Sequence, residues 1–318
     1  MILQTQIPLK KEVHNPINYN SKILLLGSCF SENIGNKLEY YKFQTTQNPF
    51  GILFHPKAIE TIITNAINEK EYTEKDIFFL NERWHCFEVH SNLSSTNKKE
   101  LLNLLNQQSQ NTNQLLTNAS HIIVTLGTSW VYRHIESDTI VANCHKIPQK
   151  KFSKEILSTN EISESLDATI QLIKSVNNNA TILFTVSPIR HLKDGYIENQ
   201  LSKSHLISAI HQVTEPRNKV HYFPSYEIMM DELRDYRFYT EDMIHPNKTA
   251  INYIWEKFFD SWFSEDSKTT MKEVSIIQNG INHRPFNRES EQHLQFLSSL
   301  KSRIASLKDQ YSFIDFNL

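Results

Sequence analysis

Glycine is scarce in this sequence, with six residues among 318, where an average usage of ~7% would give about twenty-two. Long apolar runs are missing too, because no stretch approaches the ~20 apolar residues that a membrane-spanning helix needs. Charges of the two signs nearly balance, with 33 Lys and Arg against 35 Asp and Glu, so there is no basic footprint for nucleic acid or an anionic membrane. We therefore expect neither a membrane span nor a nucleic-acid partner.

Cysteine is rare as well. Cys29, Cys86 and Cys144 are far apart and form no C-x-x-C pair, so neither a disulfide framework nor a zinc knuckle is predicted. The opening residues 1–13 lack a basic segment followed by an apolar stretch, which favours a cytoplasmic protein. We expect no cofactor and no metal. The alternative is a metal site among residues whose spacing matches no zinc motif, namely His85, Cys86, His90, Cys144, His145 and His191.

Short apolar runs alternate with helical patterns along the chain. Three runs are apolar on both faces, as in the central strands of a parallel sheet that helices cover on each side: 22–26, 121–126 and 180–186. Weaker runs, expected as outer strands, lie at 41–45 and 219–223. The helical patterns are at 31–40, 56–68, 162–176, 199–213 and 247–263. This alternation predicts a three-layer α/β/α fold with a doubly wound, mainly parallel five-stranded sheet, which binds ligands beyond the carboxyl ends of its strands.

The main domain is expected to span residues 1–263, with an insertion at about 71–118. Aromatic residues followed by a Ser/Asn-rich stretch and a Leu/Asn/Gln pattern predict a small hairpin and a helix in the insertion. Residues 264–318 are expected to form a helical extension. Its apolar residues recur at three- and four-residue intervals, at Leu294, Leu297, Leu300, Ile304 and Leu307. We expect this helix to pack back on the body, with a homodimer through it as the alternative.

Three of the six glycines lie at or just after the ends of predicted strands. Gly27 ends the first strand, Gly51 lies in the loop after the second, and Gly127 ends the third. Glycine lets the backbone turn sharply or approach a ligand closely. Because the carboxyl ends of parallel strands share one edge of a sheet, these positions predict a common site at that edge.

Two short segments carry the chemistry expected of such a site. Gly27-Ser28-Cys29-Phe30 runs from a strand into a helix, where free N–H groups and the helix dipole stabilise an oxyanion or thiolate. Asp242 and His245 are three residues apart, before Pro246, and this spacing can place the carboxylate on one imidazole nitrogen while the other faces a nucleophile. Nucleophile, base and orienting carboxylate together indicate acyl-transfer chemistry.

Either Cys29 or Ser28 could be the nucleophile. Successive residues leaving a strand point in opposite directions, so we expect only one of the two to face His245. Cysteine is the better nucleophile, and a helix N-terminus with a nearby histidine is expected to lower the thiol pKa below its usual ~8.5. A thioester intermediate can also be intercepted by an alcohol or amine. Transfer to a hydroxyl acceptor is therefore an alternative to hydrolysis.

Six ordered segments between Lys22 and Phe263 resemble the GSCFA domain family: LLLGSCFSENIG, NPFGILFHP, TLGTSWVY, NCHKIP, TVSPIRH and DMIHPN. That family is related to the SGNH, or GDSL-like, hydrolases, which are esterases and acyl hydrolases with a flavodoxin-like sheet. The resemblance implies an esterase that acts on an O-acyl ester or thioester of a small molecule or carbohydrate. In the SGNH pattern the nucleophile stands two places after the first glycine, so Gly27 matches the glycine and Cys29 falls on the nucleophile.

The same resemblance assigns roles to other residues. Asp242 and His245 match the D-x-x-H block, and Gly51 is the nearest match to an oxyanion-hole glycine. The third block departs from the SGNH pattern, because Gly127-Thr128-Ser129-Trp130 lacks the asparagine that donates to the oxyanion. Thr128, Ser129 and Asn48 are candidates for the missing donor. The lost asparagine also supports a third hypothesis, a non-catalytic module that binds carbohydrate or peptide.

Polar residues in two further segments are expected at the same sheet edge. Asn143 and His145 precede a Lys-Ile-Pro turn, and Arg190 and His191 follow the fourth predicted strand. His145 and His191 are candidates to bind substrate, and the alternative is that they hydrogen-bond the loops that carry them. Arg190 is a candidate to hold a substrate carboxylate or phosphate.

Overall fold

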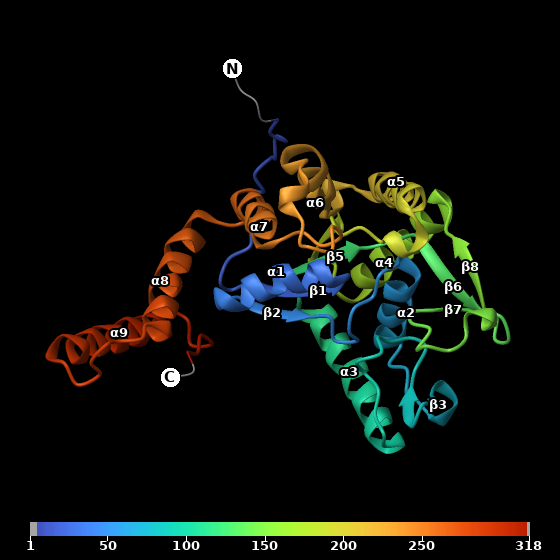
Figure 1. Cartoon of the computed structure of the whole chain (residues 1–318), viewed down its shortest axis with the longest axis horizontal. Coiled ribbons are helices and arrows are strands. Elements are labelled where there is room, and N and C mark those ends of the chain that lie inside the picture. The colour runs from blue at the N-terminus through green and yellow to red at the C-terminus, as the bar shows by residue number, and fades with distance from the viewer. Residues whose placement is uncertain (1–4, 317–318) are drawn as a thin grey trace.

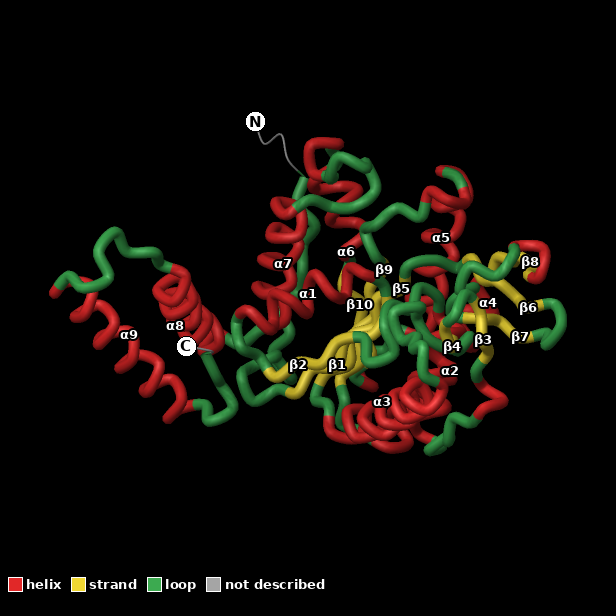
Figure 2. The backbone as a smooth tube through the Cα atoms, turned by 60° about the horizontal axis from the view of Figure 1, so that its bottom comes forward, coloured by secondary structure: helices red, strands yellow, loops and turns green. Residues whose placement is uncertain are grey.

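The computed structural model describes residues 5–316. Its central sheet has five strands in the order β10-β9-β5-β1-β2, and every neighbouring pair is parallel. The strands are β1 (Lys22–Gly27), β2 (Gln44–Gln47), β5 (His121–Leu126), β9 (Thr181–Val186) and β10 (Val220–Phe223). In chain order this is the 2-1-3-4-5 arrangement of flavodoxin-like folds, as Figure 2 shows from one side. The predicted doubly wound sheet is confirmed.

One outer strand begins later than expected. The weak run at 41–45 is mostly a turn, and β2 starts at Gln44. Lys42 adopts a positive φ of 63° just after α1 ends, a conformation that interrupts extended structure. The strand therefore forms only once the chain has left this turn.

Alternating side chains of the central strands feed two separate hydrophobic cores. Leu24 and Leu26 of β1 belong to one core, and Ile23 and Leu25 belong to the other. Helices α2 (Pro56–Ile67), α3 (Lys98–Asn118), α4 (Thr159–Val176) and α5 (Tyr196–Val213) pack on the first face. Helices α1 (Cys29–Tyr40) and α7 (Lys248–Trp262) pack on the second. The result is a three-layer α/β/α body (Figure 1).

The segment 71–118 contains the hairpin and the helix that its composition predicts. Strands β3 (Phe78–Leu80) and β4 (Arg83–His85) pair antiparallel. Three leucines of α3, Leu101, Leu105 and Leu116, are fully buried and lie in the same core as the central strands. The helix of this segment therefore belongs to the main body of the fold.

A second, three-stranded sheet in the order β7-β6-β8 was not predicted. Its antiparallel strands are β6 (Trp130–His134), β7 (Thr139–Val141) and β8 (Phe152–Ile156). Arg133 Nε donates to Glu155 Oε1 at 3.0 Å across β6 and β8. These strands carry charged and aromatic residues rather than an apolar run, so no continuous hydrophobic signal marked them.

The C-terminal extension holds two helices, α8 (Glu265–Asn282) and α9 (Glu291–Gln310), where one was predicted. Both lie to one side of the body in Figure 1. The predicted stripe of α9 is mostly buried, at Leu300, Ile304 and Leu307, in a core that includes Val274 and Ile277 of α8. The start of the stripe is not buried, because Leu294 is 56% exposed.

Short helical segments complete the fold: α6 (Ser225–Glu227), a π-helix (Ile228–Leu233), and 3₁₀ turns at Glu74–Asp76, Gln149–Lys151, Leu192–Asp194, Pro216–Asn218 and Tyr236–Phe238. Within residues 5–316, no helix combines the length and the apolar character needed to cross a bilayer.

Candidate active site

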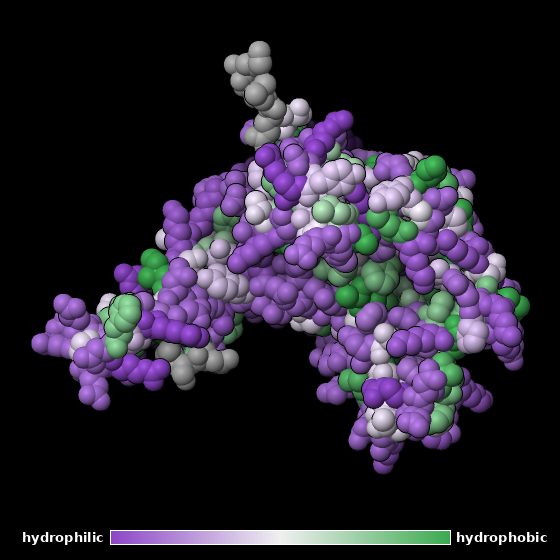
Figure 3. All heavy atoms as spheres, viewed as in Figure 1, coloured by the Kyte–Doolittle hydropathy of each residue, from purple (hydrophilic) through white to green (hydrophobic). Residues whose placement is uncertain are grey.

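A cavity of about 750 Å³ lies at the carboxyl edge of the central sheet. In the view of Figure 3, hydrophobic residues show in a hollow of an otherwise largely hydrophilic surface. The cavity begins at Cys29 and His245 and extends to the small sheet, where Trp130, Tyr132 and Phe152 line it. It brings together most of the predicted polar site residues: Cys29, Thr128, Asn143, His145, Arg190, His191 and His245.

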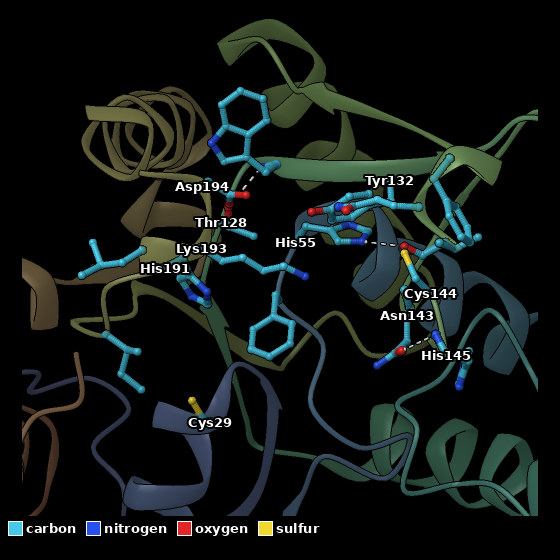
Figure 4. Close-up of a pocket in the computed structure, with 18 of the residues that line it drawn as sticks. Cys29, His55, Thr128, Tyr132, Asn143, Cys144, His145, His191, Lys193 and Asp194 are labelled. Atoms are coloured by element: carbon cyan, nitrogen blue, oxygen red, sulfur yellow. Dashed lines mark hydrogen bonds between the residues drawn. The ribbon is translucent and has the colours of Figure 1, made fainter. Parts of the chain in front are cut away.

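Cys29 and Ser28 face different surroundings. Ser28 is the N-cap of α1, is 0% exposed, and accepts a hydrogen bond from the N–H of Phe30 at 3.3 Å. Cys29 is the first helical residue and lines the cavity, with its sulfur directed into the space that His191 also faces (Figure 4). The two side chains diverge because one must turn back to cap the helix.

The thiol of Cys29 is harder to ionise than predicted. Burial raises its pKa, and Glu32 adds to this rise. The backbone N–H groups at the start of α1 and the charge of Lys203 act in the opposite direction but do not reverse it. The expectation of a lowered thiol pKa is therefore wrong, because desolvation outweighs the effect of the helix terminus.

Asp242 and His245 form the pair that their spacing predicts. His245 Nδ1 lies 2.6 Å from Asp242 Oδ2, and both side chains are about half exposed, at 49% and 45%. Asp242 Oδ1 also accepts the Thr240 hydroxyl at 2.6 Å and the N–H of Ile244 at 2.8 Å. The Thr240 hydroxyl, followed by the backbone and ring donors of His245, lowers the pKa of Asp242. The carboxylate thus fixes the imidazole and leaves Nε2 free of this bond.

The ring nitrogen Nε2 of His191 is buried and has no hydrogen-bond partner among residues 5–316. A Cβ atom at Gly127 would lie only 2.9 Å from this nitrogen, so the glycine is what allows the ring to approach the end of β5. The ring packs edge-on against Phe54, with centroids 5.4 Å apart. Burial, assisted by Lys203 and His245, lowers the pKa of His191 to about 3, so the imidazole is neutral at physiological pH.

Two candidates for the missing oxyanion donor are tied to the end of β5. The N–H of Thr128 donates to the carbonyl of Phe54 at 3.1 Å, and its hydroxyl lies 3.0 Å from that of Ser202. Ser129 is 0% exposed, and its N–H donates to the Ser202 hydroxyl at 2.7 Å. Only Thr128 of these two lines the cavity.

The candidates from the loop after β2 lie outside this cavity. Gly51 has a φ of 74°, and its N–H donates to the carbonyl of Asn48 at 2.8 Å. Asn48 Oδ1 accepts the N–H of Gly27 at 2.9 Å, while its Nδ2 is buried and finds no partner among the residues that the structure describes. Asn48 therefore holds the end of β1, whereas Gly51 lies against His90 and Asn92.

Arg190 lies beside the Asp242–His245 loop. Its guanidinium stacks over the ring of Tyr239 at 4.3 Å and over that of Tyr236 at 5.4 Å. Its backbone N–H donates to the carbonyl of Ile244 at 3.3 Å. Within residues 5–316 no carboxylate forms an ion pair with Arg190, so its charge is available at the cavity.

Asn143 and His145 line the far end of the cavity. The Asn143 side chain accepts the N–H of His145 at 2.8 Å, and His145 Nε2 donates to the carbonyl of Cys86 at 2.7 Å. Burial lowers the pKa of His145 to about 4. This loop is therefore held in place by neutral hydrogen bonds. Cys144, which stands between Asn143 and His145, also lines the cavity.

Lys203 was not predicted. It is 0% exposed, and its Nζ donates to the carbonyls of Gly127 and Ser187, each at 2.7 Å. Burial lowers its pKa to about 7. One signal could have found it, because Lys203, Leu206 and Ile210 follow the i, i+3, i+7 spacing of a buried helical stripe.

The cysteines and histidines do not assemble a metal site in the described part of the chain. Across residues 5–316, no three His, Cys, Asp or Glu side chains lie close enough together to hold a metal ion. Five of these residues lie at the end of β4, in the loop after it, or in the loop after β7: His85, Cys86, His90, Cys144 and His145. The metal alternative gains no support.

The GSCFA family model matches residues 22–258, and a model described as the C-terminal domain of GSCFA domain proteins matches residues 274–318. No curated protein sequence matches the chain. Among solved structures, an acetyl xylan esterase (Est2A) from the rumen bacterium Butyrivibrio proteoclasticus is similar at 10% identity with a TM-score of 0.38. That match covers 84% of this chain and 66% of the esterase chain. Because the first family model spans most of the sequence, in the order the motifs predict, this chain belongs to the GSCFA family.

Proposed function

We propose that this protein is an acyl hydrolase that cleaves an O-acyl ester or thioester, with Cys29 as nucleophile, His245 as base and Asp242 as the group that orients the base. The observation that carries the proposal is the cavity itself. The Cys29 thiol and the His245 imidazole both line it, and Asp242 holds His245 at 2.6 Å. Ser28 is a poor candidate, because its hydroxyl is buried under α1 as a helix cap.

The proposed reaction begins when the Cys29 sulfur attacks the acyl carbonyl carbon and His245 takes the thiol proton. The imidazolium then donates this proton to the departing alkoxide, which leaves a thioester on Cys29 and a free alcohol. In the second half, His245 removes a proton from water and the hydroxide attacks the thioester. This releases the acid, and the thiol is restored by the proton that His245 carries.

The developing oxyanion needs donors, and two groups are suited to supply them. The backbone N–H of Cys29 lies at the first position of α1, where helical N–H groups have no intrahelical partner. His191 Nε2 is buried, has no hydrogen-bond partner in the described part of the chain, and faces the same space as Cys29 (Figure 4). A neutral imidazole with its proton on Nε2 can donate one hydrogen bond, and we assign it the role of the absent asparagine.

The shape of the cavity favours a second candidate function, acyl transfer. The space continues past the thiol to an aromatic wall formed by Trp130, Tyr132 and Phe152, which leaves room for an acceptor beside the acyl group. An acceptor hydroxyl, such as that of a sugar, would replace water in the second half of the reaction. Product analysis with and without added sugar alcohols distinguishes the two outcomes.

The test uses p-nitrophenyl acetate with the full-length protein. We expect a burst of p-nitrophenol and an acetyl group on Cys29, detected by intact mass and peptide mapping. Cys29→Ala should abolish both, whereas Ser28→Ala should retain the acetyl-enzyme with a stability loss of about 1 kcal/mol from the missing cap. Absence of acetylation on Cys29 in the wild type, combined with saturable binding of sugars or peptides, would instead establish the non-catalytic alternative.

A further inference from the structure

Lys203 carries a potential charge in a place that offers it no ordinary counter-ion. Its side chain is 0% exposed, and within residues 5–316 no carboxylate forms an ion pair with it. Its two hydrogen-bond acceptors are the neutral carbonyls of Gly127 and Ser187. The other groups that face Nζ are the ring of Tyr226, whose centroid is 5.7 Å away, and the neutral His191. A buried ammonium group without a counter-ion is costly, so the reason for a lysine at this position must lie in the ionisable groups near it.

The neighbours of Lys203 lie at the nucleophile. Gly127 follows β5, and the carbonyl of Thr125 in β5 accepts the N–H of Ser28 at 3.0 Å, directly before Cys29. The lysine therefore lies behind the strand ends that support the start of α1. Cys29 is the ionisable group whose charge favours the charged lysine, and the lysine in turn favours the ionised thiol.

We propose that Lys203 is a positioning residue that serves as the buried counter-ion of the Cys29 thiolate. The proposal rests on the proposed function, in which Cys29 is the nucleophile. When the thiol ionises, its proton passes to His245 while Lys203 is protonated. The pair then consists of one anion and one cation in a poorly solvated region, where their attraction is stronger than in water.

The hydrogen bonds of Lys203 suit this role. Two donors of the ammonium group are held by carbonyls at the ends of neighbouring strands, β5 and β9. This fixes the nitrogen behind the cavity floor and at the same time ties together the loops that carry Thr128 and His191. A purely structural lysine would need only the two carbonyls, whereas a counter-ion must also change the ionisation of Cys29.

The pH dependence of Cys29 alkylation by iodoacetamide distinguishes these roles. In Lys203→Met and Lys203→Gln, we expect Cys29 alkylation to slow about tenfold at about pH 6.5, where Lys203 is largely protonated, and to be unchanged at about pH 9.5, where it is a neutral amine. Lys203→Gln retains an amide donor for the carbonyls without the charge, so it gives the same reading should Lys203→Met fail to fold. A cooperative thermal transition in each protein confirms that the compared proteins are folded.

A matched control is available on α4. Lys174 donates to the carbonyls of Ala180 and Asn178, at the opposite end of β9, and Lys174→Met should leave the alkylation profile unchanged. An unchanged profile in a folded Lys203 variant, or an equal shift in Lys174→Met, overturns the counter-ion role. Failure of wild-type Cys29 to react at all overturns the proposed function instead, so the two failures are distinguishable.

Discussion

From the burial of Lys203 we predict how the free energy of unfolding depends on pH. In the unfolded chain Lys203 titrates near ~10.4, whereas burial lowers its pKa to about 7 in the folded protein. Between these values the unfolded state binds the additional proton, so the free energy of unfolding must rise with pH. Each pH unit in that window is worth about 1.4 kcal/mol, which gives about 3 kcal/mol between pH 7 and pH 9.5.

The measurement compares urea unfolding of two proteins at these two pH values. Both carry Cys29→Ala, so that the thiol does not titrate, and one also carries Lys203→Met. The contribution of about 3 kcal/mol should appear only in the protein that keeps the lysine. Other titrating groups, such as the buried Tyr19 and Tyr72 with their raised pKa values, are common to both proteins and cancel.

The sign of the difference is as informative as its size. Below pH 7 the folded protein must bury the charged lysine, so Lys203→Met should be least harmful, or even stabilising, under these conditions. At pH 9.5 the lysine is a neutral amine that still serves two carbonyls, and the methionine leaves both without a donor. Parallel pH dependences of the two proteins, within about 0.5 kcal/mol, would refute the claim that the folded state shifts the titration of Lys203.

Three further predictions concern the site and its support. Asp242→Asn should lower kcat for p-nitrophenyl acetate by about 10²- to 10⁴-fold, because an amide no longer fixes His245, while iodoacetamide should still label the protein; near-normal turnover would contradict the orienting role. His191→Leu should lower kcat/KM by about 10²-fold or more, with His191→Gln retaining part of the activity through its amide donor; equal losses in both variants would argue against hydrogen-bond donation. Gly27→Ala should lower the free energy of unfolding, measured with urea, by at least about 2 kcal/mol, because φ at this position is 131° and the added Cβ would lie 2.1 Å from the Thr125 carbonyl oxygen. A variant as stable as the wild type would show that the end of β1 relaxes easily.

The central sheet could be predicted because its strands are buried on both faces. The run His121–Leu126 is buried throughout, and so is Thr181–Val186, so nearly every residue there contributes to the signal. The outer strand β2 has no buried residue and was placed too early. The small sheet β6–β8 was missed for a related reason, since its residues contact solvent, one another and the cavity more than the core.

The candidate site could be predicted in part because each of its two segments is local in sequence. Ser28 and Cys29 are adjacent at the first turn of α1, and Asp242 contacts His245 only three residues further along the chain. Lys203 is different, because its importance comes from carbonyls that lie 76 and 16 positions away. No spacing in the sequence predicts such contacts. The only local signal is that Lys203 lies on the buried face of α5 among apolar residues.

The hydrogen bond from Phe30 to Ser28 has a consequence for how the glycine-containing motif can vary. Ser28 is required here as an acceptor for a helical N–H, and aspartate serves this purpose equally well. Position 28 can therefore hold serine or aspartate, since either side chain can cap the helix that begins at Cys29. Exchange of Ser28 for aspartate should thus preserve the helix start, and the identity of the chemistry would rest on the next residue alone.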